Sequence, residues 1–137
     1  MLQQKIIIQN QLSELETIAT TLETIGENWD LPMSITLNLN LVLEELITNI
    51  IFYGYTDKNE HFIEINIDFD DSRIFLKVED DGIAFNPLLK EEADISLAVE
   101  DREIGGLGIH FVRKLMDTIS YERKNEKNIL TMMKTVK

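Results

Sequence analysis

VLEELITNIIFYGY, residues 42–55, is the stretch from which the fold of this chain can be worked out. Apolar residues recur in and just before it at steps of three and four, which predicts an amphipathic helix with one buried face. Glu45 and Asn49 are four residues apart on the flank of that face, so their side chains stack one turn above the other. A carboxamide oxygen can ligate Mg²⁺, and a carboxylate can orient or activate a nucleophile. Alone the pair is a weak signal, because most such pairs on helices are simply solvated.

The rest of the chain alternates between strand and helix patterns. The pattern of residues 4–9 predicts a strand, and that of residues 13–29 predicts a helix. Ser34 is expected to cap the next helix, which runs to about Tyr53. A period of two in residues 61–70 and 73–80 predicts an antiparallel hairpin with one buried face. We expect a long loop at 86–104, a helix from about 109, and strands at 118–124 and 129–136 joined by a turn at 125–128.

This order of elements predicts the fold class. Paired antiparallel strands with helices on one face make an α/β (α+β) two-layer sandwich. A doubly wound fold would need alternating βαβ units and a phosphate loop directly after a strand, and the chain has neither.

Composition restricts the classes of function. The 137 residues are long enough for one domain, residues 1–137, with a single core. No cysteine is present, which excludes disulfides and thiolate chemistry and fits a cytoplasmic protein. The net charge of −12 argues against binding to nucleic acid or to an anionic membrane, and leaves room for a basic protein partner. We expect no membrane span and no signal peptide.

Two further patterns point to a nucleotide. Asp80 and Gly82 follow a predicted buried strand, where a carboxylate can accept a hydrogen bond from the exocyclic amine of adenine; a turn explains the same residues. Gly105-Gly106-Leu107-Gly108 precedes an amphipathic helix, so its backbone can approach a phosphate at a helix N-terminus. A glycine pair alone is equally consistent with a simple turn.

Together and in this order, the patterns resemble those of the GHKL ATPase/kinase superfamily with its Bergerat ATP-binding fold. Within it the chain is most similar to the stand-alone anti-sigma-factor serine kinases of the RsbW and SpoIIAB type, over residues 5–136. The matching boxes are Glu45, Asn49, Tyr53 and Gly54; Asp80, Gly82, Ala84 and Phe85; and Gly106, Leu107 and Gly108.

The resemblance implies a Bergerat-type mixed, mostly antiparallel sheet with an ATP lid at about 86–104. It also implies ATP or ADP with Mg²⁺ as ligands, Asn49 as the metal ligand and Glu45 as the general base or orienting group. Asp80 would hold the adenine amine, Gly82 would belong to the same nucleotide-binding box, and the backbone of 106–109 would hold the phosphates. The implied walls of the purine site are Ile83, Phe85 and Leu107, with Ile109 at the start of the helix and Thr131 supporting adenine through water.

Some residues depart from the family pattern. Ala84 stands where many relatives have glycine, Tyr53 replaces a more frequent histidine, and Arg102 does not match the spacing of the family's lid arginine. ATP binding is therefore better supported than phosphoryl transfer.

Three functions remain open from the sequence. The first is an ATP- and Mg²⁺-dependent serine/threonine kinase that phosphorylates an anti-anti-sigma (STAS) protein and has a sigma factor as its other partner. The second is a nucleotide-gated module that binds a partner without significant kinase activity. The third is a detached catalytic domain of a histidine-kinase-like assembly. The family further implies a homodimer formed through the N-terminal strand and helix.

Overall fold

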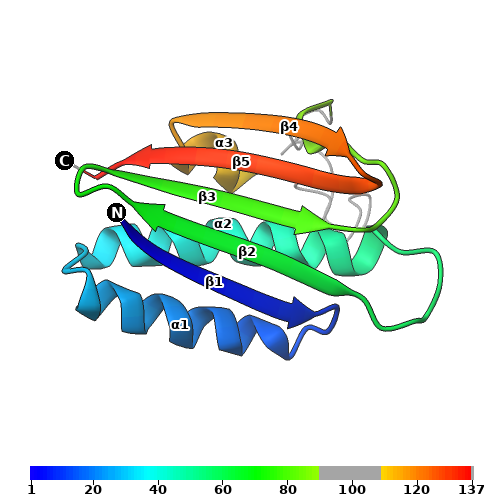
Figure 1. The fold of residues 1–137 in the computed structure, drawn as a ribbon, viewed down its shortest axis with the longest axis horizontal. Helices are drawn as coiled ribbons and strands as arrows, with labels where there is room; N and C mark the ends of the chain where they lie inside the picture. The colour runs from blue at the N-terminus through cyan, green and yellow to red at the C-terminus, as the bar shows by residue number, and fades with distance from the viewer. Residues whose placement is uncertain (90–108, 137) are drawn as a thin grey trace, which may run out of the picture.

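The computed structural model describes residues 1–89 and 109–136. Its five strands are β1 (Leu2–Gln9), β2 (Phe62–Phe69), β3 (Arg73–Asp80), β4 (Thr118–Lys124) and β5 (Lys127–Thr135). They form one sheet in the order β1-β2-β3-β5-β4, and every pair of neighbours is antiparallel (Figure 1). The helices are α1 (Glu14–Asn28), α2 (Met33–Tyr53), α3 (His110–Leu115) and the 3₁₀ turn η1 (Pro87–Leu89).

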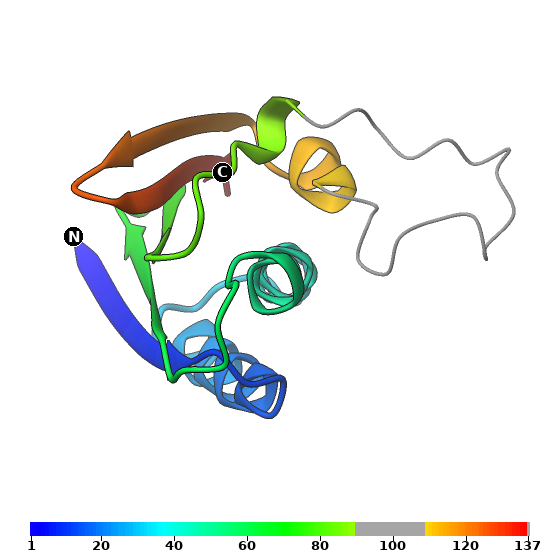
Figure 2. The same cartoon turned by 90° about the vertical axis from the view of Figure 1, so that its right-hand side faces the viewer.

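The helices α1, α2 and α3 lie on the same side of the curved sheet (Figure 2). This is the two-layer α+β sandwich that the sequence predicts. The alternation in β2 and β3 is confirmed, since Ile63, Ile65 and Ile67 are all 0% exposed on the helix side. Burying each of these side chains contributes about 1.5–3 kcal/mol to the free energy of unfolding, so the pattern decides which face of the hairpin meets the helices.

Helix α2 lies centrally in the core. Leu39, Val42, Leu43 and Ile47 are each 0% exposed, as the helical spacing predicts. By length and composition alone α2 could cross a membrane, with a mean hydropathy of 1.4 over an 18-residue window. Its buried face packs in the core, however, as the central helix of a sandwich does.

Two predicted boundaries are wrong by a few residues. Ser34 does not cap α2; the helix begins at Met33 after Pro32, whose fixed φ of −56° is compatible with a helix start. The turn between β4 and β5 contains only Asn125 and Glu126, which have φ values of 53° and 63°. Both central residues at positive φ are typical of a tight hairpin turn, so Asn128 lies inside β5 rather than in the turn.

Candidate functional site

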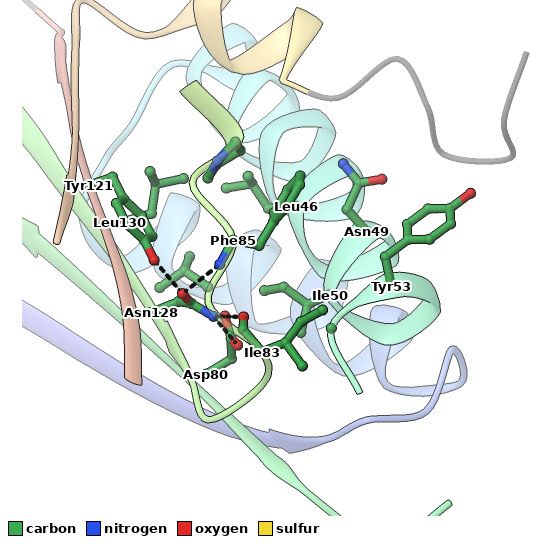
Figure 3. A pocket seen from close by; sticks show the side chains of 13 residues that line it. Leu46, Asn49, Ile50, Tyr53, Asp80, Ile83, Phe85, Tyr121, Asn128 and Leu130 are labelled. Carbon is green, nitrogen blue, oxygen red and sulfur yellow. Dashed lines mark hydrogen bonds between the residues drawn. The ribbon is translucent and has the colours of Figure 1, made fainter. Parts of the chain in front are cut away.

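A pocket of about 550 Å³, with the open space at its mouth included, lies between α2 and the ends of β3, β4 and β5 (Figure 3). Most of its lining is apolar, and Asp80, Asn128, Asn49 and Tyr53 contribute polar groups. Asp80 comes from the end of β3, whereas Asn49 and Tyr53 project from α2 (Figure 3). Its apolar walls are formed by Leu46, Ile50, Val78, Ile83, Phe85, Pro87 and Leu130, with the Tyr121 ring beside them.

Asp80 is a buried carboxylate, 7% exposed, on the side of this pocket. Its Oδ1 accepts hydrogen bonds from the Gly82 N–H at 2.9 Å and from Asn128 Nδ2 at 3.0 Å. Burial raises the pKa of Asp80, and the hydrogen bonds from Asn128 and Gly82 oppose that shift. A buried carboxylate of this kind is suited to a ligand that brings a hydrogen-bond donor into an apolar cavity.

Asn128 holds the segment that follows β3. Its Nδ2 donates to Asp80 and to the Ile83 carbonyl at 2.8 Å, and its Oδ1 accepts from the Phe85 N–H at 3.2 Å and from the Tyr121 hydroxyl. The side chain is buried and its amide is fully used (Figure 3). The sequence interpretation missed Asn128 because it placed this residue in a turn; the alternation of Asn128 with Leu130 and Met132 was the available signal.

Gly82 is packed against the exit from α2. The Ile83 N–H donates to the Gly54 carbonyl at 2.8 Å, and Arg123 donates to the Gly82 carbonyl at 2.9 Å. A Cβ on Gly82 would lie 2.4 Å from the Gly54 carbonyl oxygen and 2.9 Å from Asp80 Oδ1. Position 82 therefore requires glycine, because the backbone of residue 82 passes too close to the backbone of Gly54 to leave room for a Cβ atom.

We expect Gly82→Ala to lower the free energy of unfolding by about 1–3 kcal/mol, because the backbone around the new methyl group must shift. Urea denaturation measures this loss. Gly26→Ala is the matched control: the nearest atom to its added Cβ is a side-chain methyl of Thr36, at 2.7 Å, so a shift of one side chain rather than of the backbone relieves the contact. Alanine is also the better helix former within α1. Equal losses in the two variants would contradict the close-approach argument.

Glu45 lies one turn before Asn49 on α2 but is not among the residues that line the pocket. Its Oε1 accepts the backbone N–H groups of Phe111 at 3.1 Å and Val112 at 3.5 Å, which ties α2 to the first turn of α3. Burial raises the pKa of Glu45 to about 7, and the two backbone hydrogen bonds work against the shift. The carboxyl group thus exchanges its proton close to neutral pH.

Four of the predicted site residues meet at this pocket: Asn49, Asp80, Ile83 and Phe85 line it, and Gly82 lies directly behind Asp80. Gly106, Leu107, Gly108 and most of the expected lid fall outside the described residues. Ile109 is 3% exposed and its side chain belongs to the hydrophobic core, so that side chain is not among those that line the pocket.

Thr131 does not line the pocket, contrary to the expectation that it supports adenine through water. It is exposed and pairs with Lys77 and Ser120, whereas Leu130 and Met132 on either side of it are buried toward the helices. The pocket lies on the Leu130 side of the sheet, so Thr131 faces away from it. The polar side chain that β5 supplies to the pocket is Asn128 instead.

Comparison with known proteins agrees with this fold. The family model for the histidine kinase-like ATPase domain matches residues 8–134. The chain therefore belongs to the histidine kinase-like ATPase domain family, a GHKL-type family whose members bind ATP or ADP, as the resemblance in sequence implies.

The relatives in sequence include a serine/threonine-protein kinase and an anti-sigma factor. The chain is 27% identical over 128 residues to the serine/threonine-protein kinase BtrW of Bordetella bronchiseptica, covering 87% of this chain and 89% of the relative. It is 25% identical over 97 residues to the anti-sigma F factor of Clostridium botulinum, covering 71% of this chain and 68% of the relative.

Solved structures agree on the fold. The catalytic domain of histidine kinase ThkA superposes with a TM-score of 0.54 at 17% identity, covering 99% of this chain and 98% of that one. The blue-light-activated histidine kinase EL346 of Erythrobacter litoralis gives a TM-score of 0.55 at 16% identity over 90% of this chain, which spans 41% of that protein.

Proposed function

We propose that this chain is a single ATP-binding domain that transfers phosphate to a serine or threonine hydroxyl of an anti-anti-sigma (STAS) protein and acts as an anti-sigma-type regulator. The observation that carries the proposal is the apolar pocket with the buried Asp80 carboxylate on one side and Asn49 on the facing helix. Relatives named as a serine/threonine kinase and as an anti-sigma factor support the same reading.

The pocket residues fit an adenine nucleotide. The Asp80 carboxylate would accept a hydrogen bond from the exocyclic amine of adenine. Guanine carries a carbonyl at the equivalent position, and this group is an acceptor and not a donor. Ile83 and Phe85 are partly exposed apolar side chains at the pocket, placed to cover a flat aromatic base. Asn128 and Gly82 would keep the Asp80 carboxylate in place through their hydrogen bonds to Oδ1.

Asn49 would hold Mg²⁺ through its amide oxygen. Among the described residues no group of three or more acidic or histidine side chains forms a metal site, so phosphate oxygens and water would complete the coordination sphere. When bound, Mg²⁺ supplies neutralisation of the phosphate charge, which is most of what phosphoryl transfer requires.

Glu45 would accept the proton of the substrate hydroxyl. The hydroxyl oxygen then bonds to the γ-phosphorus, and the bond from the γ-phosphorus to the β-phosphate oxygen breaks. Both of its hydrogen bonds to α3 go to Oε1, and we assign Oε2 to the incoming proton. Its pKa of about 7 suits a general base at neutral pH, since the carboxylate is partly ionised and can hold the proton it receives.

Further parts of the proposal concern assembly. The net charge of −12 suits a basic surface on a sigma factor or another protein partner and disfavours nucleic acid and anionic membranes. We further propose that the chain acts in the cytoplasm and forms a homodimer through β1 and α1.

One observation favours the alternative, a nucleotide-gated binding module without significant kinase activity. Glu45 already binds two backbone N–H groups of α3 and stands outside the pocket lining, so its role can be limited to joining the two helices.

Two measurements on one preparation separate these functions. Isothermal calorimetry with Mg-ADP tests the pocket, and γ-labelled ATP with a STAS protein from the same genome tests transfer. Binding together with acid-stable label on serine or threonine supports the kinase. Binding without transfer to any STAS partner supports the binding module, and no heat with Mg-ADP contradicts both functions.

A further inference from the structure

His61 lies in a cluster of titratable side chains behind the pocket, outside the site described above. It ends the loop that leaves α2 at Gly54 and enters β2 at Phe62. Its Nδ1 lies 3.2–3.3 Å from the two carboxylate oxygens of Asp81, the residue next to Asp80. A second contact joins the same two segments, the 2.8 Å hydrogen bond from the Ile83 N–H to the Gly54 carbonyl.

The imidazole of His61 is held on three sides. Its Nε2 lies 2.8 Å from Asp57 Oδ1, and its ring stacks on Tyr55 with 4.2 Å between ring centroids. Its backbone N–H donates to Asn10 Oδ1 at 3.0 Å. The side chain is only 17% exposed, so its position is defined by these partners.

Both contacts with carboxylates require the charged form of the ring. A neutral imidazole has one N–H donor, and its other nitrogen is an acceptor. Each nitrogen of His61 faces a carboxylate, which when ionised can only accept, so the neutral ring would set a lone pair against either Asp57 or Asp81. The hydrogen bond with Asp57 raises the pKa of His61, with Asp81 adding to the effect and desolvation opposing it.

The surrounding groups also favour the cation. Glu60, Glu79 and Asp80 line the same hollow as His61 and Asp81, and Lys127 is the basic side chain there. Tyr55 stays a neutral phenol, because burial raises its pKa and the nearby aspartates add to that shift. The balance of charge around the ring is therefore negative.

We propose that the imidazolium of His61 is a positioning group for the pocket. By joining Asp57 to Asp81 it holds the segment 81–83 against Gly54, and loss of its proton loosens that segment. The segment carries Gly82 and Ile83, so nucleotide binding weakens as the pH rises through the titration of His61. This last consequence rests on the proposed function, whereas the coupling of His61 to Ile83 does not.

The coupling can be tested in the nucleotide-free protein by nuclear magnetic resonance. Between about pH 5.5 and pH 9, the Ile83 backbone amide should shift with the same midpoint as the His61 ring protons. Asp57→Asn should move both midpoints to lower pH, because it removes a carboxylate that stabilises the cation. His110, the other histidine, is the internal control, and the Ile83 amide should not follow the chemical shifts of its ring protons. An Ile83 amide that does not follow His61, or a midpoint that Asp57→Asn leaves in place, overturns the inference.

Calorimetry tests the consequence for the nucleotide. From about pH 6 to pH 8.5 the wild type should lose roughly two- to fivefold in Mg-ADP affinity, the range expected for one partly exposed ion-pair network. In His61→Gln the affinity for Mg-ADP should already be reduced at the lower pH. The further loss of affinity on raising the pH should be absent from this variant. Glu45 titrates in the same range, but both proteins keep it, so the difference between them reports His61.

The outcomes are distinguishable. No binding at any pH contradicts the proposed function and leaves the Ile83 measurement to decide the coupling. Binding with the same pH dependence in wild type and His61→Gln overturns the positioning role. If His61→Gln does not fold, Asp57→Asn replaces it, with the loss of affinity expected at a lower pH than in wild type.

Discussion

Glu45→Gln should lower the rate of phosphoryl transfer about 10²- to 10⁴-fold, the usual contribution of a general base, while Mg-ADP affinity stays within about threefold. The variant is conservative for the fold. A glutamine Oε1 can still accept the N–H groups of Phe111 and Val112, so the contact between α2 and α3 remains. Only the capacity to take a proton is lost. Single-turnover transfer from γ-labelled ATP to the STAS partner measures the effect.

Glu44→Gln is the matched control, because Glu44 is the neighbouring residue on α2 and is exposed. It removes the same charge from the same turn of the helix and should leave transfer unchanged. A Glu45→Gln protein that transfers phosphate at the wild-type rate would remove the general base from the proposal and leave Glu45 as a link between helices.

The same variant has a consequence for stability. The pKa of Glu45 in the folded protein, about 7, lies above the ordinary value of 4.5, so folding favours the protonated form. The protonated Glu45 carboxyl group therefore contributes to the free energy of unfolding. This contribution is complete below about pH 4.5 and is lost as the pH rises through 7. Urea denaturation should therefore show the wild type losing stability relative to Glu45→Gln across this range. A constant difference between the two proteins would mean that the carboxyl group ionises as freely in the folded chain as in the unfolded one.

Asp80→Asn is expected to lower the affinity for Mg-ADP by about 10- to 100-fold, the effect of losing a charge-assisted hydrogen bond. The asparagine oxygen can replace Oδ1 and accept from Gly82 and Asn128, so the local structure is kept. Its Nδ2 group, however, is a donor and would face the donor amine of adenine. Calorimetry with adenine and guanine nucleotides measures both the affinity and the preference.

Two controls accompany this variant. Asp68→Asn changes a residue of β2 that pairs with Phe75 on the other face of the sheet and should bind Mg-ADP as the wild type does. Because burial raises the pKa of Asp80, its ionised form opposes folding, and Asp80→Asn should be at least as stable as the wild type at neutral pH. Unchanged binding and unchanged base preference would show that Asp80 is not the adenine contact.

Local patterns predicted the sheet well, for a physical reason. In β2, and in β3 as far as Val78, every second side chain is an isoleucine, leucine, valine or phenylalanine, and a shift of one residue would expose the whole set to water. The spacing in α2 likewise has one solution that buries Leu39, Val42 and Ile47 together. In such segments burial of apolar area outweighs the alternatives, so sequence alone is sufficient.

Patterns failed where two local preferences competed. Ser34 is a good cap by composition, but Pro32 starts α2 before it. Glu126 at positive φ is an uncommon turn residue, which hid the tight turn and with it the position of Asn128 in β5. For Thr131 the alternation was correct, and the error was the assumption that a residue facing away from Leu130 could still reach the pocket.

By itself the sequence determined the two-layer fold, the buried faces of its strands and helices, and the family. Each of these follows from periodic burial or from residues close together in the chain. Only the tertiary structure decided that Asn128 meets Asp80 from 48 residues away, that Glu45 binds the backbone of α3, and that His61 stands between Asp57 and Asp81. These contacts join segments whose approach depends on how whole elements pack, and no local pattern carries that information.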